Sequence, residues 1–180
     1  MSQKTHWVII VACYLGINGG EAHSSDSLNF VQQYEALSIP TDGRPWVLAR
    51  GAASNAPLVE YVLQGQSLQA WTSLLTVQYV AGQYNDRHVA QIVHATRQNL
   101  ERDCPSLKWS DGLSAPNAVQ YEWRHYGCQG FPAQHELVKI AKGRHGLFIM
   151  HYVEKALQLN PEVRNRWLMA FDNAFIAEFK

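Results

Sequence analysis

The segment that most constrains the fold is HELVKIAKGRHGLFIMHYV, residues 135–153. Two predicted strands, 135–141 and 147–153, flank KGRHG, whose two glycines favour a tight hairpin between them. Upstream, residues 118–126 alternate between apolar and polar side chains, as a strand with one buried face does. The alternation sets Val119, Tyr121 and Trp123 on one face against Gln120, Glu122 and Arg124 on the other. The sequence therefore predicts three antiparallel strands.

Two helices are predicted on either side of these strands. The first is capped by Asn85 or Asp86 and stopped by Pro105, which leaves Cys104 at its end. Its apolar stripe follows helical spacing: Val89, Ile92, Val93, Thr96 and Leu100. The second helix begins at Asn160, with a proline at its first helical position. Its expected buried face is Val163, Trp167, Leu168, Phe171, Phe175 and Phe179.

The remaining segments give weaker signals. Residues 46–49, 58–63 and 74–80 are expected to be strands. Residues 28–37 have near-helical apolar spacing or form an irregular lead-in, and residues 106–117 read as a polar loop. The predicted class is α+β, an antiparallel sheet with a long central helix and a C-terminal helix packed on it.

The N-terminus resembles a secretory signal peptide. Lys4 precedes an apolar run of about 11 residues, too short for the roughly 20 that a membrane-spanning helix needs. Asn18, Gly19 and Gly20 then break the run, and cleavage is expected near Ala22. We therefore expect a signal peptide over 1–22 and a single domain over 23–180. IVAC also resembles a lipobox, so Cys13 is an alternative lipidation site.

Composition bounds the function classes. Hydrophobic residues make up 47% and charged residues 17%, which is typical of a folded globular chain and not of a disordered one. The formal net charge is zero, so no global field recruits nucleic acid. We expect no nucleic-acid partner, and a membrane only if Cys13 is lipidated.

Removal of a signal peptide leaves an even number of cysteines, Cys104 and Cys128. In an oxidising compartment this pattern indicates one disulfide, closing a loop of about 25 residues with a stabilisation of about 3.5 kcal/mol. A zinc site using His125 and Cys128 is the first alternative, but the sequence offers no second close pair of ligands. A catalytic thiol is the second, and it needs an activating histidine and a reduced state.

One segment resembles a family pattern, EYV..G.....W..L.TVQ, found in small exported bacterial proteins of unassigned function. The matching residues are Glu60, Tyr61, Val62, Gly65, Trp71, Leu74, Thr76, Val77 and Gln78. This resemblance implies an exported protein with a cysteine pair and brings no chemistry with it. The order of elements is also similar to the Mog1/PsbP-like fold, whose members mostly act as binding or assembly factors. Fold resemblance alone does not carry function.

Common catalytic motifs are absent from the sequence: there is no Gly-x-Ser-x-Gly, no P-loop and no His-Glu-x-x-His. The sharpest constellation is QYEWRH, with Glu122, Arg124 and His125. A carboxylate, a cation and a histidine are the groups that cyclising ribonucleases use, and His151 would have to supply the acid. The simpler interpretation is an internal ion pair between Glu122 and Arg124, which share a strand face.

Other candidate residues are aromatic or imidazole side chains. His125, His135 and His151 lie on successive predicted strands and could converge on one sheet face. Trp46 and Trp109 flank loops and are candidate contact residues, whereas Trp71, Trp123 and Trp167 are expected in the core.

The expected function is non-catalytic binding or assembly of a protein partner or small ligand in the periplasm or outside the cell. We expect no catalytic residue, no metal and no cofactor. The alternatives are a secreted hydrolase or ribonuclease using Glu122 with histidine and arginine, or an immunity or inhibitor protein.

Overall fold

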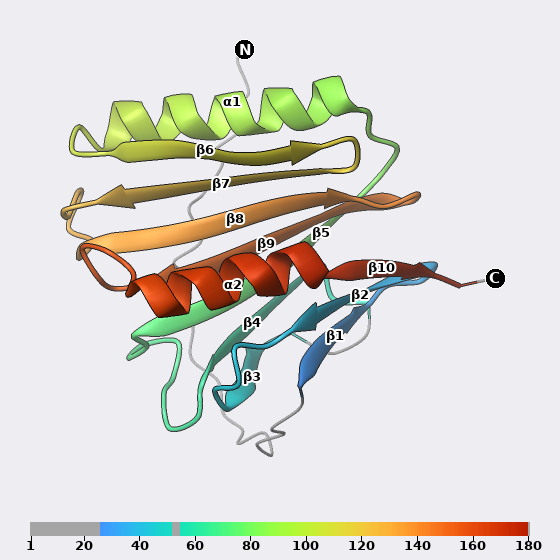
Figure 1. Ribbon diagram of the computed structural model, residues 1–180, viewed down its shortest axis with the longest axis horizontal. Helices are drawn as coiled ribbons and strands as arrows, with labels where there is room; N and C mark the ends of the chain where they lie inside the picture. The colour runs from blue at the N-terminus through green and yellow to red at the C-terminus, as the bar shows by residue number, and fades with distance from the viewer. Residues whose placement is uncertain (1–25, 52–54, 180) are drawn as a thin grey trace, which may run out of the picture.

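The computed structural model describes residues 26–51 and 55–179, and the expected signal peptide lies outside them (Figure 1). Ten strands and two helices follow in the order β1 Ser27–Val31, β2 Glu35–Pro40, β3 Trp46–Arg50, β4 Leu58–Leu63, β5 Ser73–Ala81, α1 Asp86–Asp103, β6 Lys108–Ala115, β7 Ala118–His125, β8 Gln134–Lys142, β9 Gly146–Glu154, α2 Pro161–Asn173 and β10 Phe175–Glu178. In the described part of the chain, no helix is long and apolar enough to cross a membrane.

Seven strands form one large antiparallel sheet in the order β3-β4-β5-β9-β8-β7-β6. The predicted strands at 118–126, 135–141 and 147–153 are confirmed as its neighbours β7, β8 and β9. Strand β5 pairs with β9 along its whole length, from Ser73 opposite Glu154 to Ala81 opposite Gly146. This pairing joins the early hairpin β4-β5 to the later meander, and it is the central long-range contact of the fold.

A second, three-stranded sheet has the order β1-β2-β10. The near-helical interpretation of residues 28–37 is therefore wrong: Glu35, Leu37 and Ile39 alternate into the interior as a strand. A short apolar run fits both periods, and here β2 pairs with its sequence neighbour β1 on one side and with β10 on the other.

The C-terminal helix begins as predicted but ends earlier. Asn160 caps α2 by accepting from the Glu162 amide, and Pro161 is its first residue. The helix ends at Asn173, and β10 then pairs with β2. Phe175 and Phe179, expected in the core, are 60% and 48% exposed because they belong to this edge strand and its end.

The two faces of the large sheet carry separate cores. One face packs against α2 and the small sheet, around Trp167, Phe171, Tyr152 and Phe148. The other packs against α1, whose Val89 and Leu100 contact a cluster that includes Trp123 and Ile140. The α+β class is thus confirmed, and Trp71, Trp123 and Trp167 are buried as expected. A central position of the long helix is not confirmed, because α1 lies along β6 and β7 at one end of the sheet (Figure 1).

Residues 106–117, expected as a polar loop, are mostly the edge strand β6. Its side chains are nearly all exposed, so it shows no buried period-two pattern that sequence inspection could detect. A register shift between Asp111 and Ser114 interrupts its pairing with β7, which is common in edge strands.

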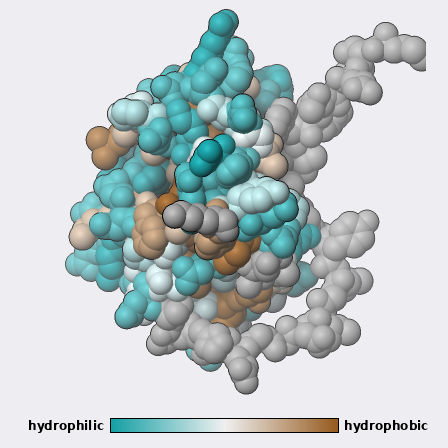
Figure 2. All heavy atoms as spheres, turned by 90° about the vertical axis from the view of Figure 1, so that its right-hand side faces the viewer, coloured by the Kyte–Doolittle hydropathy of each residue, from teal (hydrophilic) through white to brown (hydrophobic). Residues whose placement is uncertain are grey.

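Figure 2 shows the side of the molecule at the right of Figure 1. Hydrophilic residues dominate this face, with hydrophobic ones grouped near its middle and lower half. The exposed Phe175 of β10 and Leu113 of β6 are among the large apolar side chains at the surface.

Candidate functional site

A cleft of about 440 Å³ opens between the β6-β7-β8 end of the large sheet and the start of α2. Its chemically active lining consists of five side chains, Lys108, Glu122, Arg124, His135 and Arg164. A concave site with converging polar groups is the usual form of a ligand-binding site.

The strand register places these groups. Lys108 lies opposite Arg124, and Arg124 lies opposite His135, so the three form a row across β6, β7 and β8. Glu122 follows on the same face, because side chains two residues apart in a strand point the same way. Arg164 comes from the first turn of α2, which Asn160 and Pro161 start at this end of the sheet.

The Glu122 carboxylate is held by two groups. Arg164 donates to it through two nitrogens, Nε to Oε2 at 2.7 Å and a terminal nitrogen to Oε1 at 3.1 Å. Nε2 of His135 lies 3.5 Å from Oε2. Contact with His135, together with the hydrogen bonds and charge of Arg164, lowers the pKa of Glu122 to about 2 against the opposing effect of burial. Glu122 is therefore a fixed anion at neutral pH.

His135 is oriented from its other side. Its Nδ1 accepts the backbone N–H of Leu159 at 2.9 Å, and the ring is buried. Because Nδ1 is the acceptor, the proton of the neutral ring is assigned to Nε2, which faces Glu122. His135 thus links the segment before α2 to the cleft floor.

The cleft has an excess of positive charge. Three cationic side chains face a single carboxylate, and that carboxylate is already paired with Arg164. Among the described residues, neither Lys108 nor Arg124 has an ion-pair partner. Two unpaired cations on adjacent strands form an attractive position for an anion.

The structure changes the predicted constellation. Glu122 and Arg124 do share a face, but Glu122 pairs with Arg164 and not with Arg124. His151 does not approach Glu122: it lies on the opposite face, with its Nδ1 2.7 Å from Glu136. His125 also faces away from the cleft, as expected, and His135 takes the place next to Glu122. The three histidines therefore do not converge on one face.

The sequence did not predict that one site would bring together Lys108, His135 and Arg164. His135 follows a connection of eight residues after β7, so its pairing with Arg124 could not be read from the sequence. Arg164 comes from a helix distant in sequence, and Lys108 from the segment interpreted as a loop.

The two tryptophans proposed as contact residues lie outside the cleft. Trp46 is only 3% exposed, so its assignment to a contact surface is wrong. Trp109 is half-buried and stacks on Tyr121 at 4.4 Å between ring centroids. Arg97 of α1 lies over its ring, on the sheet face opposite the cleft.

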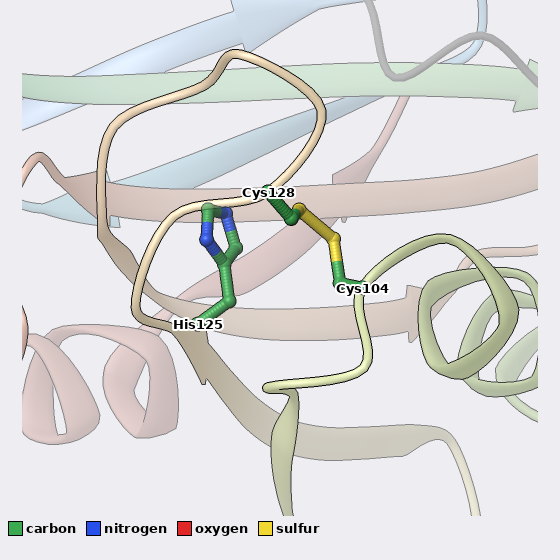
Figure 3. Close-up of side chains that lie close together, drawn as sticks. All are labelled: Cys104, His125 and Cys128. Atoms are coloured by element: carbon green, nitrogen blue, oxygen red, sulfur yellow. A yellow bond between two sulfur atoms is a disulfide. The ribbon is translucent and has the colours of Figure 1, made fainter.

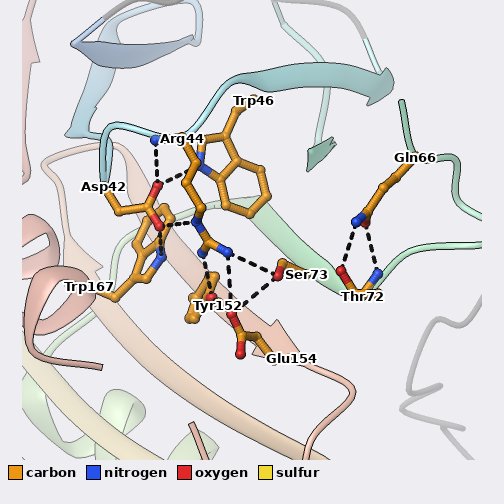
Figure 4. A network of polar contacts seen from close by, with 9 residues as sticks. All are labelled: Asp42, Arg44, Trp46, Gln66, Thr72, Ser73, Tyr152, Glu154 and Trp167. Atoms are coloured by element: carbon orange, nitrogen blue, oxygen red, sulfur yellow. Dashed lines mark hydrogen bonds and ion pairs between the residues drawn. The ribbon is translucent and has the colours of Figure 1, made fainter. Parts of the chain in front are cut away.

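Trp46 belongs to a buried polar cluster around Asp42 (Figure 4). The fully buried Asp42 carboxylate accepts from Arg44 Nε, from the Arg44 backbone N–H, and from the indole N–H groups of Trp46 and Trp167. Arg44 also donates to Tyr152 at 2.6 Å. Through the hydrogen bond between Asp42 and Trp167, this cluster joins the β2-β3 connection to α2.

The predicted disulfide is present: Cys104 at the end of α1 is bonded to Cys128, with the Cα atoms 5.4 Å apart (Figure 3). His125 lies beside the pair, and one ligand atom from each of the three residues falls within 4.8 Å of the other two. The structure thus adds Cys104 to the His125 and Cys128 set that the sequence considered for zinc.

No protein-family model matches the chain, and no curated protein matches it at a significant level.

Proposed function

We propose that the protein is an exported, non-catalytic binding domain that holds an anionic ligand in the cleft between β6-β8 and α2. The observation that carries the proposal is the pair Lys108 and Arg124, which face the cleft without a carboxylate partner among the described residues. The ligand class is a small molecule that carries phosphate or carboxylate groups, since arginine binds both through paired hydrogen bonds.

The bonding of Glu122 argues for binding over catalysis. A general base works best with a pKa near the working pH, and the pKa of Glu122 is about 2. Its two oxygens are occupied by Arg164, and the Nδ1 of His135 is occupied by Leu159. These groups support the cleft wall and leave Lys108 and Arg124 for the ligand.

Export is part of the same proposal. The signal-like residues 1–22 and a disulfide between the remaining cysteines are both typical of a periplasmic or secreted protein, and lipidation at Cys13 is the alternative mode. The resemblance to Mog1/PsbP-like binding and assembly factors stays a prediction.

Calorimetric titration of the mature protein with inorganic phosphate, citrate and a nucleoside monophosphate tests the proposal. At least one of these anions should bind, with an affinity that falls as salt rises. Arg124→Gln should weaken that binding about tenfold or more, the effect of losing one charge-assisted contact worth about 1.5–3 kcal/mol. Arg166→Gln is the matched control, because Arg166 is exposed on α2 and does not line the cleft.

Absence of binding by all three anions, or equal loss in the Arg124 and Arg166 variants, would contradict the proposal.

A second candidate function is cleavage of a phosphodiester. It is favoured by one observation: the cleft gathers a carboxylate, a histidine and three cations, the set used by cyclising ribonucleases. Incubation with single-stranded RNA and analysis for 2′,3′-cyclic phosphate ends tests it. Activity that disappears in Glu122→Gln while the fold persists would replace the binding proposal with this one.

A further inference from the structure

Cys104, His125 and Cys128 lie close together on the sheet face opposite the cleft (Figure 3). We propose that, when its disulfide is reduced, this group forms a three-ligand site for a thiophilic divalent ion, with Zn²⁺ as its occupant. Two thiolates and one imidazole are a known zinc donor set that leaves one coordination position open.

The geometry needs little adjustment. The ligand atoms already lie within 4.8 Å of one another, and zinc with bonds of about 2.0–2.3 Å brings such atoms to about 3.5–3.8 Å. One ring nitrogen of His125 points toward Cys128 in Figure 3. We expect the sulfur atoms to separate slightly on reduction.

Other contacts hold the two cysteines together without the S–S bond. Gln129 Nε2 donates to the Asp103 carbonyl at 3.3 Å, and the Tyr126 amide donates to Ser106 Oγ at 3.3 Å. Both bonds join the loop after β7 to the end of α1. The reduced cysteines are therefore expected to stay close.

The backbone around each cysteine is also fixed locally. Cys128 and Phe131 exchange two backbone hydrogen bonds across a tight turn that includes the positive φ angles of Gln129 and Gly130. On the other side, the Cys104 amide donates to the Leu100 carbonyl and closes the last turn of α1. Neither arrangement depends on the sulfur atoms.

The ring of His125 is held in one place. It is 3% exposed and stacks on Trp123 at 5.7 Å, so few orientations are open to it. Its Nδ1 accepts the Gly127 amide at 3.0 Å, so the proton of the neutral ring is assigned to Nε2. Ligation through Nε2 therefore requires that proton to move to Nδ1 and the hydrogen bond from Gly127 to break. Cys128 is the more exposed of the two cysteines.

Reduction of the disulfide precedes metal binding. A dithiol reductant supplies two electrons and two protons, becomes a cyclic disulfide, and converts the Cys104–Cys128 bond into two thiols. Zn²⁺ then displaces both thiol protons and binds the two thiolates and the neutral imidazole. Disulfide and metal exclude each other, so the redox state of the thiols decides which one is present.

Anaerobic titration of the reduced full-length protein with Co²⁺ tests the proposal. One equivalent should give the thiolate-to-metal charge-transfer absorption and the intense visible bands of tetrahedral cobalt, and Zn²⁺ should abolish both. The oxidised protein and the Cys104→Ser, Cys128→Ser double variant should give neither. His125→Gln should lower the Zn²⁺ affinity of the reduced protein tenfold or more and alter the cobalt spectrum.

His151→Gln is the matched control, since it removes another histidine from the same sheet face and should leave the Zn²⁺ affinity unchanged. Circular dichroism of each oxidised variant, with intact mass to count thiols, checks that the fold and the disulfide survive the substitution.

Reduced wild-type protein that binds no Co²⁺ through thiolate overturns the proposal. An unchanged affinity in His125→Gln does so as well, as does a reduced chain that unfolds and is not restored by Zn²⁺.

Discussion

At the scale of single residues, two carboxylates, the fully buried Asp42 and the half-buried Glu122, each accept hydrogen bonds that include one from a distant part of the chain. Asp42 accepts four hydrogen bonds, from Arg44, Trp46 and Trp167. Glu122 is held by Arg164 and His135. Buried anions of this kind are tolerated because their partners replace the lost water. Removing the charge leaves those donors unsatisfied.

We expect Asp42→Asn to lower the free energy of unfolding by about 3 kcal/mol, because it removes the charge of a fully buried carboxylate and leaves the half-buried Arg44 only its longer ion pair with Glu154. Urea denaturation followed by tryptophan fluorescence measures the change. Asp103→Asn removes an ion pair at the surface and serves as the control, with an unchanged urea midpoint. Equal midpoints for both variants would mean that the Asp42 cluster does not contribute to stability.

Glu122 predicts a pH dependence with a definite sign. Its pKa is about 2 in the folded protein and 4.5 in the absence of these contacts. Its contribution to stability is therefore complete above about pH 4.5 and is lost as the pH falls toward about 2. Thermal midpoints measured across this range should fall less steeply in Glu122→Gln than in wild type. Glu101→Gln, at an exposed helix position, should reproduce the wild-type slope.

At the scale of elements, polar side chains connect structures that hydrophobic packing alone would leave free to slide. Helix α2 is anchored near its start by Arg164 to Glu122, and at its end by Lys139, which donates to the Phe171 carbonyl. The β8-β9 hairpin is fixed by Glu35 of β2. That carboxylate accepts from the Arg144 amide at 3.0 Å and from the Tyr79 hydroxyl at 3.1 Å.

The contact between Glu35 and the β8-β9 hairpin requires a glycine at position 143, because there is no room for a side chain. A Cβ atom at this position would overlap the Glu35 carboxylate, which is fully buried and cannot move aside. Gly143→Ala should therefore cost about 1–3 kcal/mol of stability, as overpacking usually does. A double-mutant cycle with Glu35→Ala measures the coupling. Strictly additive losses would show that the two positions do not interact.

At the scale of the whole molecule, the two ends of the described chain meet in one sheet. Strand β2 lies between β1 and β10, so the small sheet forms only when the last strand has been placed. The disulfide adds a second long-range link, between the end of α1 and the loop after β7. Of the two links, only the disulfide persists in the unfolded chain and reduces its conformational freedom.

Replacing both cysteines, as in Cys104→Ser, Cys128→Ser, should destabilise the oxidised protein by about 3.5 kcal/mol, the loop-entropy value for a separation of 24 residues. The urea midpoints of wild type and variant give the difference. The urea midpoint of the wild type, measured in reductant with a metal chelator, should approach that of the variant. If the oxidised wild type and the variant are equally stable, the disulfide does not reduce the conformational freedom of the unfolded chain.

The sequence alone determined the elements whose signals are local. The hairpin over 135–153, the amphipathic stripe of α1, the Asn160-Pro161 helix start and the cysteine pairing were predicted correctly, and Asn85 was one of the two caps considered. Each depends on periodicity or capping within a few residues, or on a cysteine count that leaves one pairing once the expected signal peptide is removed. Such signals can be read without knowing which parts of the chain pack against each other.

Only the tertiary structure decided the small sheet, the edge strand β6 and the composition of the cleft. Residues 28–37 contain β1 and the start of β2, which pair with each other, and β10 adds to β2 from more than a hundred residues away. Likewise, Lys108, Arg124 and His135 form one row only through the registers of β6, β7 and β8, and Arg164 arrives from α2. Strand register depends on which whole faces become buried as well as on the turns, and the long connection from β7 to β8 leaves the register of these two strands open in a single sequence.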